Sequence, residues 1–191
     1  MGAERGYEYG LMPGLMLLRQ AKEMGVQEIT YYGFTLDNCK RPGIQRKAFQ
    51  KACVDAINLI ASEGTALLVV GNTESRNFPQ ELLPYTKRTQ INGGGIKVNF
   101  LVNYGWEWDV SYLKERETGE ENVLSGIHSS DISRIDLIIR WGDMRRLSGF
   151  LPLQSVYSDF FVVQDLWPDY RPEHLMQALD WYQKQDVTLG G

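Results

Sequence analysis

The sequence contains only two cysteines, and their scarcity limits the kinds of site that the chain can form. Cys39 and Cys53 are far apart and lack the Cys-x-x-Cys spacing of many zinc and redox sites. Small secreted domains that are held by disulfides need more cysteines than this. The sequence therefore predicts neither a disulfide framework nor a zinc site, and its cysteine content fits the reducing cytoplasm. Cys53 falls on the apolar stripe of an expected helix and is predicted to lie in the core.

Long apolar runs and dense basic clusters are also missing. No run approaches the roughly twenty apolar residues that span a bilayer, and the first residues lack a basic region followed by an apolar core. We therefore expect no transmembrane segment, although a lipid substrate would still bring the protein to a membrane surface. The formal net charge of −4 argues against a general nucleic-acid-binding surface. Any binding site for an anion must then be local.

The length and the apolar content favour one domain over residues 1–191. With 43% hydrophobic residues the chain can bury one substantial core. Apolar runs of strand length alternate with helical periodicity, which predicts an α/β fold with a mainly parallel central sheet flanked by helices. Residues 1–10 are expected to be mobile. The expected helices are 11–24, 44–63, 79–88, 109–116 and 172–184, and the expected strands are 29–34, 66–70, 96–102, 135–139 and 160–163.

An arginine cluster follows the apolar run that begins at Ile135. The run ends abruptly at Arg140, so a buried parallel strand would present a cation at its carboxyl end. Arg145, Arg146 and Ser148 follow within one loop. Arginine donors match the geometry of phosphate oxygens, and the ligands of open α/β sheets gather at the carboxyl ends of strands. The pattern predicts a site for a diphosphate.

The alternative for the arginines is a solvated surface on which they pair with nearby acids such as Asp136 and Asp143. Polar residues also follow the first expected strand, where a loop carries Thr35, Asn38 and Arg41. Asparagine is a common turn residue, so a purely structural role is the alternative at that position.

Motifs occur in three separated stretches of the sequence. One of them, RWGDMRRLSGF at 140–150, resembles without a gap the segment RTSGEQRLSNF of the cis-prenyltransferases, the undecaprenyl diphosphate synthase family. The following LPLQSVYSDFFVVQDLWPDY is similar to LWQSAYAELYFTDVLWPDF. Earlier in the chain, GFTLDNCKRP resembles AFSTENWKRP, and VNFLVNYGWEWD resembles LNIALNYGGRWD. Because the motifs occur in the same order, the resemblance extends over nearly the whole chain.

The resemblance implies condensation of an allylic diphosphate with isopentenyl diphosphate. In the family, Mg²⁺ assists the departure of the allylic diphosphate, and arginines hold the other substrate. By matching position, Arg140, Arg146 and Ser148 would hold isopentenyl diphosphate. The resemblance thus assigns the arginine cluster to one of the two substrates.

Further roles follow from the other matched positions. Thr35, Asn38 and Arg41 would correspond to family residues that act in catalysis and substrate placement. Phe34 belongs to the same segment and would lie near the prenyl chain. Asp159 stands where the family has a glutamate associated with the metal, and the alternative is that it caps or pairs near the arginines.

Histidines and tryptophans give more general indications. His128 and His174 are separated and lie among polar residues, which predicts surface positions. Trp106, Trp108 and Trp167 are expected to pack in the core, with the wall of a prenyl tunnel as the alternative.

The chain departs from the family pattern in several places. The family begins with an apolar strand and DGNGRWA, whose aspartate is the main Mg²⁺ ligand, and the printed sequence has neither. Without that strand, the sheet is expected to have an open edge or a gap. Tyr7 and Glu8 replace a histidine and an arginine, which should weaken diphosphate binding. Trp141 replaces a threonine beside the arginine cluster.

These departures leave two expectations open. The protein is either a divergent transferase, which condenses or cyclises prenyl diphosphates, or a non-catalytic accessory subunit of a heteromeric cis-prenyltransferase. The retention of Arg140, Arg146 and Ser148 favours the transferase. The resemblance also implies a homodimer that pairs through its C-terminal half, with no nucleic-acid partner.

Overall fold

The computed structural model describes residues 10–40, 42–115 and 123–186, in which helices and strands alternate. The first half contains α2 (Leu11–Glu23), β1 (Glu28–Thr35), α3 (Gly43–Ala61), β2 (Ala66–Val70), β3 (Thr89–Gln90) and β4 (Lys97–Tyr104). The second half contains α4 (Trp106–Asp109), β5 (Leu137–Trp141), β6 (Asp159–Val163) and α5 (Pro172–Tyr182). Short 3-10 helices are η2 (Leu36–Lys40), η3 (Gln80–Tyr85), η4 (Ser111–Glu115), η5 (Val123–Gly126) and η6 (Trp167–Asp169). Residues 1–10 are expected to be mobile, and all of them except Gly10 lie outside the described residues.

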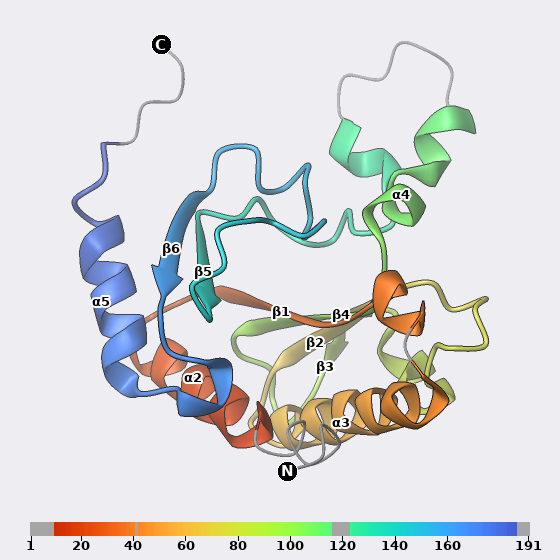
Figure 1. Ribbon diagram of the computed structural model, residues 1–191, viewed down its shortest axis with the longest axis horizontal. Helices are drawn as coiled ribbons and strands as arrows, with labels where there is room; N and C mark the ends of the chain where they lie inside the picture. The colour runs from red at the N-terminus through yellow and green to blue at the C-terminus, as the bar shows by residue number, and fades with distance from the viewer. Residues whose placement is uncertain (1–9, 41, 116–122, 187–191) are drawn as a thin grey trace.

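The strands form two mainly parallel sheets. The larger sheet has the order β1–β4–β2–β3, in which only β3 is antiparallel to its neighbour, and the smaller sheet consists of β5 parallel to β6. Figure 1 shows α2 and α3 against the large sheet and α5 beside β6. The predicted α/β fold with mainly parallel strands and flanking helices is confirmed. No helix in the described part of the chain is long and apolar enough to cross a membrane.

Two apolar cores lie on the two faces of the large sheet. On one face, residues of α2 and α3 such as Leu18 and Ile57 pack with Phe100 of β4. On the other face, Leu101 packs with Leu151 from the loop before β6. Because both faces are covered, β2 is buried along its whole length and β4 along all but its first residue.

The outer edges of β1 and β5 are open. Each strand has one hydrogen-bonded neighbour in the described structure, so the two sheets do not join into one ladder. All five residues of β5 are only partly buried, which corrects the prediction of a fully buried strand. The two sheets nevertheless share both cores, because Ile139 packs against the first core and Ile138 against the second. Side chains rather than backbone bonds therefore connect the sheets.

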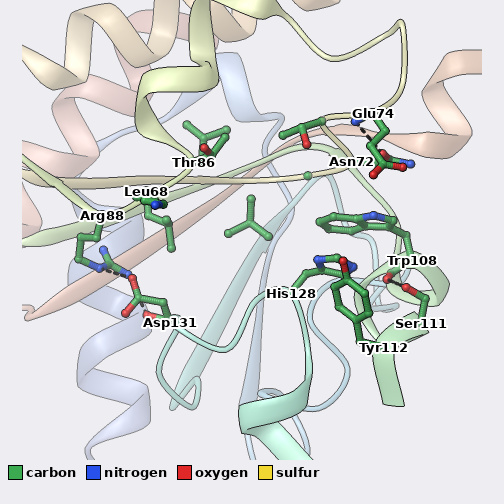
Figure 2. Close-up of a pocket in the computed structure, with 15 residues that line it drawn as sticks. Leu68, Asn72, Glu74, Thr86, Arg88, Trp108, Ser111, Tyr112, His128 and Asp131 are labelled. Atoms are coloured by element: carbon green, nitrogen blue, oxygen red, sulfur yellow. Dashed lines mark hydrogen bonds and ion pairs between the residues drawn. The ribbon is translucent and has the colours of Figure 1, made fainter. Parts of the chain in front are cut away.

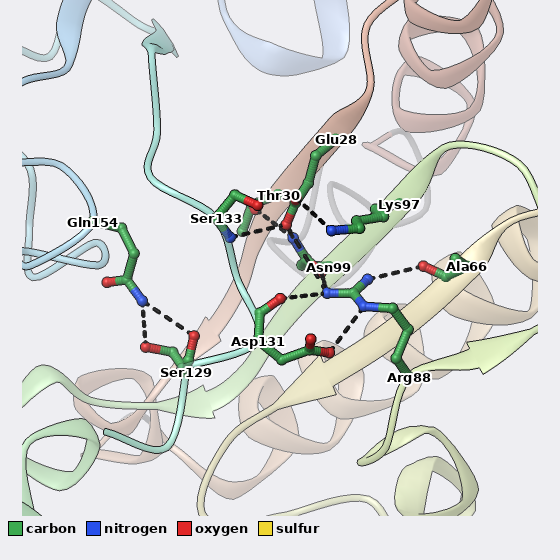
Figure 3. A network of polar contacts seen from close by, with 10 residues as sticks. All are labelled: Glu28, Thr30, Ala66, Arg88, Lys97, Asn99, Ser129, Asp131, Ser133 and Gln154. Atoms are coloured by element: carbon green, nitrogen blue, oxygen red, sulfur yellow. Dashed lines mark hydrogen bonds and ion pairs between the residues drawn. The ribbon is translucent and has the colours of Figure 1, made fainter. Parts of the chain in front are cut away.

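A polar network fixes the amino ends of the large sheet (Figure 3). The Arg88 guanidinium donates to the Ala66 carbonyl at 3.1 Å and to Asn99 Oδ1 and Asp131 Oδ2 at 2.9 Å. Asn99 in turn donates to Glu28 Oε1 at 2.8 Å. Burial opposes ionisation of Glu28, yet hydrogen bonds led by that from Asn99 lower its pKa. The network joins β1, β2 and β4 at the end of the sheet where these strands begin.

Two expected helices differ from the structure. In place of a helix over 79–88, the chain forms the shorter η3, which contains Pro84, and proline lacks the N–H that an α-helix needs. In place of a helix from Asp109 to Arg116, α4 ends at Asp109 and η4 follows. The Asp109 carboxylate is buried and accepts hydrogen bonds from Tyr104 and Ser129. These contacts hold the end of α4 against the sheet.

Candidate functional site

The arginine loop, residues 142–149, begins directly after β5 and has an unusual backbone. Gly142 has a φ of 83°, and Asp143 and Ser148 also have positive φ values of 53° and 52°. Left-handed backbone is uncommon for residues other than glycine. Such conformations persist where surrounding contacts determine them, and they are frequent at binding sites. The loop is therefore wound into a defined shape at the carboxyl end of β5.

Contacts from both sheets hold this loop. Arg140 Nη1 donates to the carbonyl oxygen of Arg146 at 2.6 Å, and Tyr32 Oη donates to the carbonyl oxygen of Ser148 at 2.9 Å. A Cβ on Gly149 would lie 3.1 Å from Trp106, so the loop also closely approaches the segment after β4. The side chains of Arg146 and Ser148 are attached to backbone that is fixed, and both residues are exposed.

The surface-pair alternative holds for only one of the arginines. Arg145 pairs with Asp143 at 3.3 Å, and both side chains are exposed. Arg140 binds a carbonyl oxygen, and neither Arg140 nor Arg146 forms an ion pair with another residue in the described part of the chain. Two guanidiniums thus lie near each other without a carboxylate between them.

The electrostatics of this pair favour an anion. Burial, followed by repulsion from the nearby Arg146, lowers the pKa of Arg140. A like charge disfavours ionisation, and an anion placed between the two cations would relieve that repulsion. Burial, followed by the charge of Asp37, raises the pKa of Tyr32 to about 12, so its hydroxyl remains a donor at neutral pH.

The carboxyl end of β1 carries the second group of predicted residues. Thr35 N donates to Asn38 Oδ1 at 3.0 Å, and Asn38 N donates to Thr35 Oγ1 at 3.2 Å. These two reciprocal hydrogen bonds span the start of η2. Asn38 therefore has the structural turn role that was the alternative prediction for this position. Phe34 is fully buried in the first core and contacts Phe49, with 5.8 Å between ring centroids. Arg41 lies outside the described residues.

Two asparagines that the sequence reasoning missed lie at the same edge. Asn103 at the end of β4 has a φ of 54°, and its Nδ2 donates to the carbonyl oxygen of Asn72, just after β2, at 2.9 Å. Cys39 Sγ lies 3.2 Å from Asn103 Oδ1. Tyr32 was missed as well. For the two asparagines the available signal was position, since both lie at the carboxyl ends of strands that run parallel.

The structure does not bring Asp159 to the arginine cluster. Asp159 begins β6 opposite Leu137, whereas Arg140 lies opposite Val162, toward the other end of the strand pair. The described residues contain no group of three histidine, cysteine, aspartate or glutamate side chains that could hold a metal ion. The described residues around Arg140 therefore do not fit a complete Mg²⁺ site.

A separate pocket lies over β2 on the face of the sheet opposite α3 (Figure 2). Its volume is about 780 Å³, and none of the predicted site residues lines it. His128 stacks on Trp108 with 4.0 Å between ring centroids, and the Tyr112 ring centroid lies 4.3 Å from that of His128. Burial lowers the pKa of His128. The predicted surface position of this histidine is therefore only partly correct, because its ring is held between two aromatic side chains.

The prediction of a surface position is wrong for His174, which is 4% exposed. Its ring nitrogens lie within hydrogen-bond distance of Trp141 and Asp165. Trp141 is 33 positions away in the sequence and Asp165 is 9 positions away, and the two supply the polar contacts that allow a histidine to be buried. Trp167 contacts Trp141 with 4.8 Å between ring centroids and is part of the same packed cluster.

Comparisons with known proteins agree with the sequence motifs. The family model described as "Putative undecaprenyl diphosphate synthase" matches residues 1–190. The chain is 22% identical to a ditrans,polycis-undecaprenyl-diphosphate synthase ((2E,6E)-farnesyl-diphosphate specific) of Vibrio vulnificus, over 97% of this chain and 81% of the relative. It is 28% identical to an isoprenyl transferase of Streptococcus thermophilus, over 97% of this chain and 84% of the relative.

Solved structures share the fold at low sequence identity. Lavandulyl diphosphate synthase from Lavandula x intermedia, solved in complex with dimethylallyl diphosphate, superposes with a TM-score of 0.85 at 17% identity, covering 100% of this chain and 90% of that one. A probable undecaprenyl diphosphate synthase from Campylobacter jejuni gives a TM-score of 0.76 at 18% identity, covering 96% and 93%. The fold of this chain, in which helices flank two mainly parallel sheets, is thus shared with these solved structures.

Proposed function

Since the chain belongs to the undecaprenyl diphosphate synthase family, we propose that it is an isoprenyl diphosphate transferase. It condenses isopentenyl diphosphate with an allylic diphosphate. The names of two of the similar proteins mention an allylic diphosphate, namely farnesyl diphosphate for the synthase of Vibrio vulnificus and dimethylallyl diphosphate for the complex of lavandulyl diphosphate synthase. We propose the same class of substrate for this chain and a cytoplasmic location, with its lipid product drawing it to a membrane surface.

The observation that carries the proposal is the pair Arg140 and Arg146 at the carboxyl end of β5. The two cations lie near each other without an acidic partner, on backbone that is held by contacts from two sheets. Guanidiniums can bind several oxygens of a diphosphate at once, and the Ser148 hydroxyl adds a further donor. We assign these three side chains to the diphosphate of isopentenyl diphosphate.

The allylic substrate is assigned to the carboxyl end of β1. Thr35 is the last residue of that strand, Asn38 and Arg41 follow it in the sequence, and Tyr32 connects it to the arginine loop. In the condensation, the allylic carbon–oxygen bond breaks with its electron pair leaving on the diphosphate. The double bond of isopentenyl diphosphate then forms the new carbon–carbon bond, and a proton is lost from the adjacent carbon. The task of the protein is to hold both substrates in line and to stabilise the departing charge.

The family typically depends on Mg²⁺, which neutralises diphosphate charge when it is bound. The described residues around Arg140 do not form a complete site for the ion, and Asp159 lies toward the far end of the β5–β6 pair. The role of Asp159 as a metal ligand stays a prediction, and no step is assigned to it.

Calorimetric titration with isopentenyl diphosphate tests the diphosphate site. Arg146→Ala should weaken binding about tenfold to hundredfold, because an arginine contact to a charged group contributes on the order of 1.5 to 3 kcal/mol. Arg145→Ala is the matched control, since Arg145 is in the same loop but is paired with Asp143. Equal affinities for Arg146→Ala and the unmodified protein would show that the phosphate assignment is wrong.

Product analysis tests the reaction itself. The protein is incubated with Mg²⁺, isopentenyl diphosphate and a series of allylic diphosphates of different length, and the extracts are examined by mass spectrometry. New prenyl diphosphates, linear or cyclic, are the expected result. Retained binding of isopentenyl diphosphate without any product would instead support a non-catalytic subunit of a heteromeric transferase.

We also propose that the protein is a homodimer that pairs through its C-terminal half. Several apolar side chains in this half are exposed, among them Val156, Tyr157 and Leu166, each at 62%. Burial of such residues in an interface would remove apolar surface from water. Light scattering at micromolar concentration should give twice the mass of the chain, and a monomer at all concentrations would contradict this assembly.

A further inference from the structure

The carboxyl end of β5 contacts a buried histidine on α5. Trp141, the last residue of β5, donates its indole N–H to His174 Nδ1 at 3.2 Å. The backbone N–H of Arg171 points at the same nitrogen from 3.3 Å. On the other side of the ring, His174 Nε2 lies 3.0 Å from Asp165 Oδ2. Both ring nitrogens of this residue, only 4% exposed, therefore have partners.

These partners determine where the imidazole carries its proton. The Trp141 indole and the Arg171 backbone can only donate, so Nδ1 must accept. The proton then lies on Nε2, which donates to the Asp165 carboxylate at 3.0 Å. Arg171 Nη2 donates to that same carboxylate at 2.7 Å and also lies 3.3 Å from Nε2. A proton on Nδ1 would face two N–H groups. The two donors at Nδ1 thus favour the Nε2–H tautomer, and partners on both sides fix the orientation of the ring.

In the described structure, strand pairing holds the end of β5 along one edge. Trp141 pairs with Val163 of β6, but the opposite edge of β5 has no strand neighbour in the described structure. Past the strand, the N–H groups of Gly142 and Asp143 still donate to the carbonyl oxygens of Asp165 at 2.8 Å and of Val163 at 3.1 Å. On the open edge, no ladder holds Arg140 and Trp141 in place. The side chain of Trp141 supplies an attachment that a second neighbouring strand would otherwise provide.

We infer that His174 is a positioning residue for the diphosphate site. By accepting the indole hydrogen bond, it fixes the last residue of β5 against α5 and thereby sets the position of Arg140 and of the arginine loop that follows. The link to substrate binding rests on the proposed function, whereas the link between His174 and Trp141 does not.

The hydrogen bond to His174 fixes the orientation of the Trp141 side chain more strictly than apolar packing alone would. The indole of Trp141 already packs on Trp167 and lies near Tyr170, with 6.0 Å between ring centroids. Flat aromatic contacts tolerate some rotation of the ring, but a directional N–H bond selects one orientation of the side chain. The orientation of Trp141 restricts the backbone on which Arg140 is carried.

Two substitutions at His174 test the contacts of its two ring nitrogens separately. His174→Asn retains an acceptor at the same number of bonds from Cα as Nδ1, so the bond from Trp141 can be kept. His174→Gln instead retains a donor in the place of Nε2, so the contact with Asp165 can be kept and the bond from Trp141 is lost. Both variants remove the ring, and they differ in which partner they keep.

The first readout is the indole N–H signal of Trp141 in nitrogen-15 NMR. The chain has five tryptophans, and the signal is assigned by its loss in Trp141→Phe. His174→Gln should move this signal and speed its exchange with solvent about three- to tenfold, the effect of one lost hydrogen bond. His174→Asn should keep exchange within about twofold of the unmodified protein, by the same reasoning. Equal behaviour of the two variants would overturn the inference.

The second readout is affinity for isopentenyl diphosphate. His174→Gln should lower affinity about three- to tenfold, and His174→Asn should restore most of it. Tyr170→Phe is the control for general destabilisation, because it removes a partly buried hydrogen bond to Gln20 in the same cluster without removing a hydrogen bond to Trp141. It should lower thermal stability and leave affinity unchanged.

The two measurements can contradict the proposed function and the positioning role of His174 independently. If the unmodified protein does not bind isopentenyl diphosphate, the proposed function is wrong, and indole exchange still tests the contact between His174 and Trp141. If binding is normal but His174→Gln leaves both exchange and affinity unchanged, the positioning role is wrong and the diphosphate site stands.

Discussion

Tyr32 Oη donates a hydrogen bond of 2.9 Å to the carbonyl oxygen of Ser148, which joins two sheets that share no backbone ladder. Tyr32 belongs to β1 of the large sheet, and Ser148 lies in the loop after β5 of the small one. Ser148 has a φ of 52°, so the bond also supports an uncommon backbone conformation. The hydroxyl of one tyrosine thus connects the two halves of the proposed substrate site.

Tyr32→Phe should weaken binding of isopentenyl diphosphate about three- to tenfold, because loss of one hydrogen bond releases the loop that carries Arg146. Titration calorimetry measures the change. Tyr31→Phe is a matched control, since its hydroxyl donates to Gly14 of α2 at 2.8 Å, away from the loop. The control should lose stability without losing affinity, and a similar loss of affinity in both variants would contradict the role of Tyr32.

Stability should fall in alkaline solution through the same residue. Burial raises the pKa of Tyr32 to about 12, compared with about 10 in an unfolded chain. The folded protein therefore holds this proton more tightly than the unfolded chain does. The resulting contribution is complete below about pH 10 and is lost as the pH rises through about 12. Urea unfolding across that range should show a shallower decline in Tyr32→Phe, and parallel curves would contradict this assignment.

Arg88→Met should lower the free energy of unfolding by about 2 to 3 kcal/mol, because it leaves buried polar partners without a donor. The Arg88 side chain is 14% exposed, and the substitution removes its bonds to Ala66, Asn99 and Asp131. Arg19→Met is the comparison, since Arg19 pairs with Glu63 on the surface and its side chain is 56% exposed. The comparison should leave unfolding nearly unchanged. Equal losses would show that the network in Figure 3 adds nothing beyond a surface pair.

Gly71→Ala should destabilise the protein by more than about 3 kcal/mol, because crowding of this kind forces backbone to move. An added Cβ would lie 1.6 Å from the carbonyl oxygen of Val102, where β2 and β4 approach each other. Gly25→Ala is the control, with nothing within 4 Å of the added Cβ but a φ of +77°. It should cost about 1 kcal/mol from backbone strain alone. Thermal unfolding of both variants shows whether steric crowding at Gly71 costs more stability than backbone strain at Gly25.

The sequence predicted the elements whose cause is local. The apolar run at Ala66–Val70 is β2 with the same bounds, and Pro172 begins α5 as expected. The abrupt change from isoleucine to Arg140 correctly placed a cation near the carboxyl end of β5. Periodicity, proline position and the ends of apolar runs are all properties of neighbouring residues, so they can be read without the fold.

Contacts between distant residues could not be predicted in this way. His174 is buried because of Trp141 and Asp165, and Trp141 is 33 positions away in the sequence. The partial exposure of β5 follows from the number of its strand neighbours, which depends on topology rather than on composition. The place of Asp159 opposite Leu137 likewise follows from strand pairing and could not be read from the motif, whereas its role as a metal ligand stays a prediction.

The open edges of β1 and β5 have a consequence for local unfolding. Because no ladder crosses between the sheets, the unit of β5, β6 and α5 can separate from the large sheet by breaking side-chain contacts alone. Proteins open in such cooperative units at a free energy below that of global unfolding. Arg140 lies on one unit and Asn38 follows the other. A small opening between the units would change the width of the proposed substrate site while both sheets stay intact.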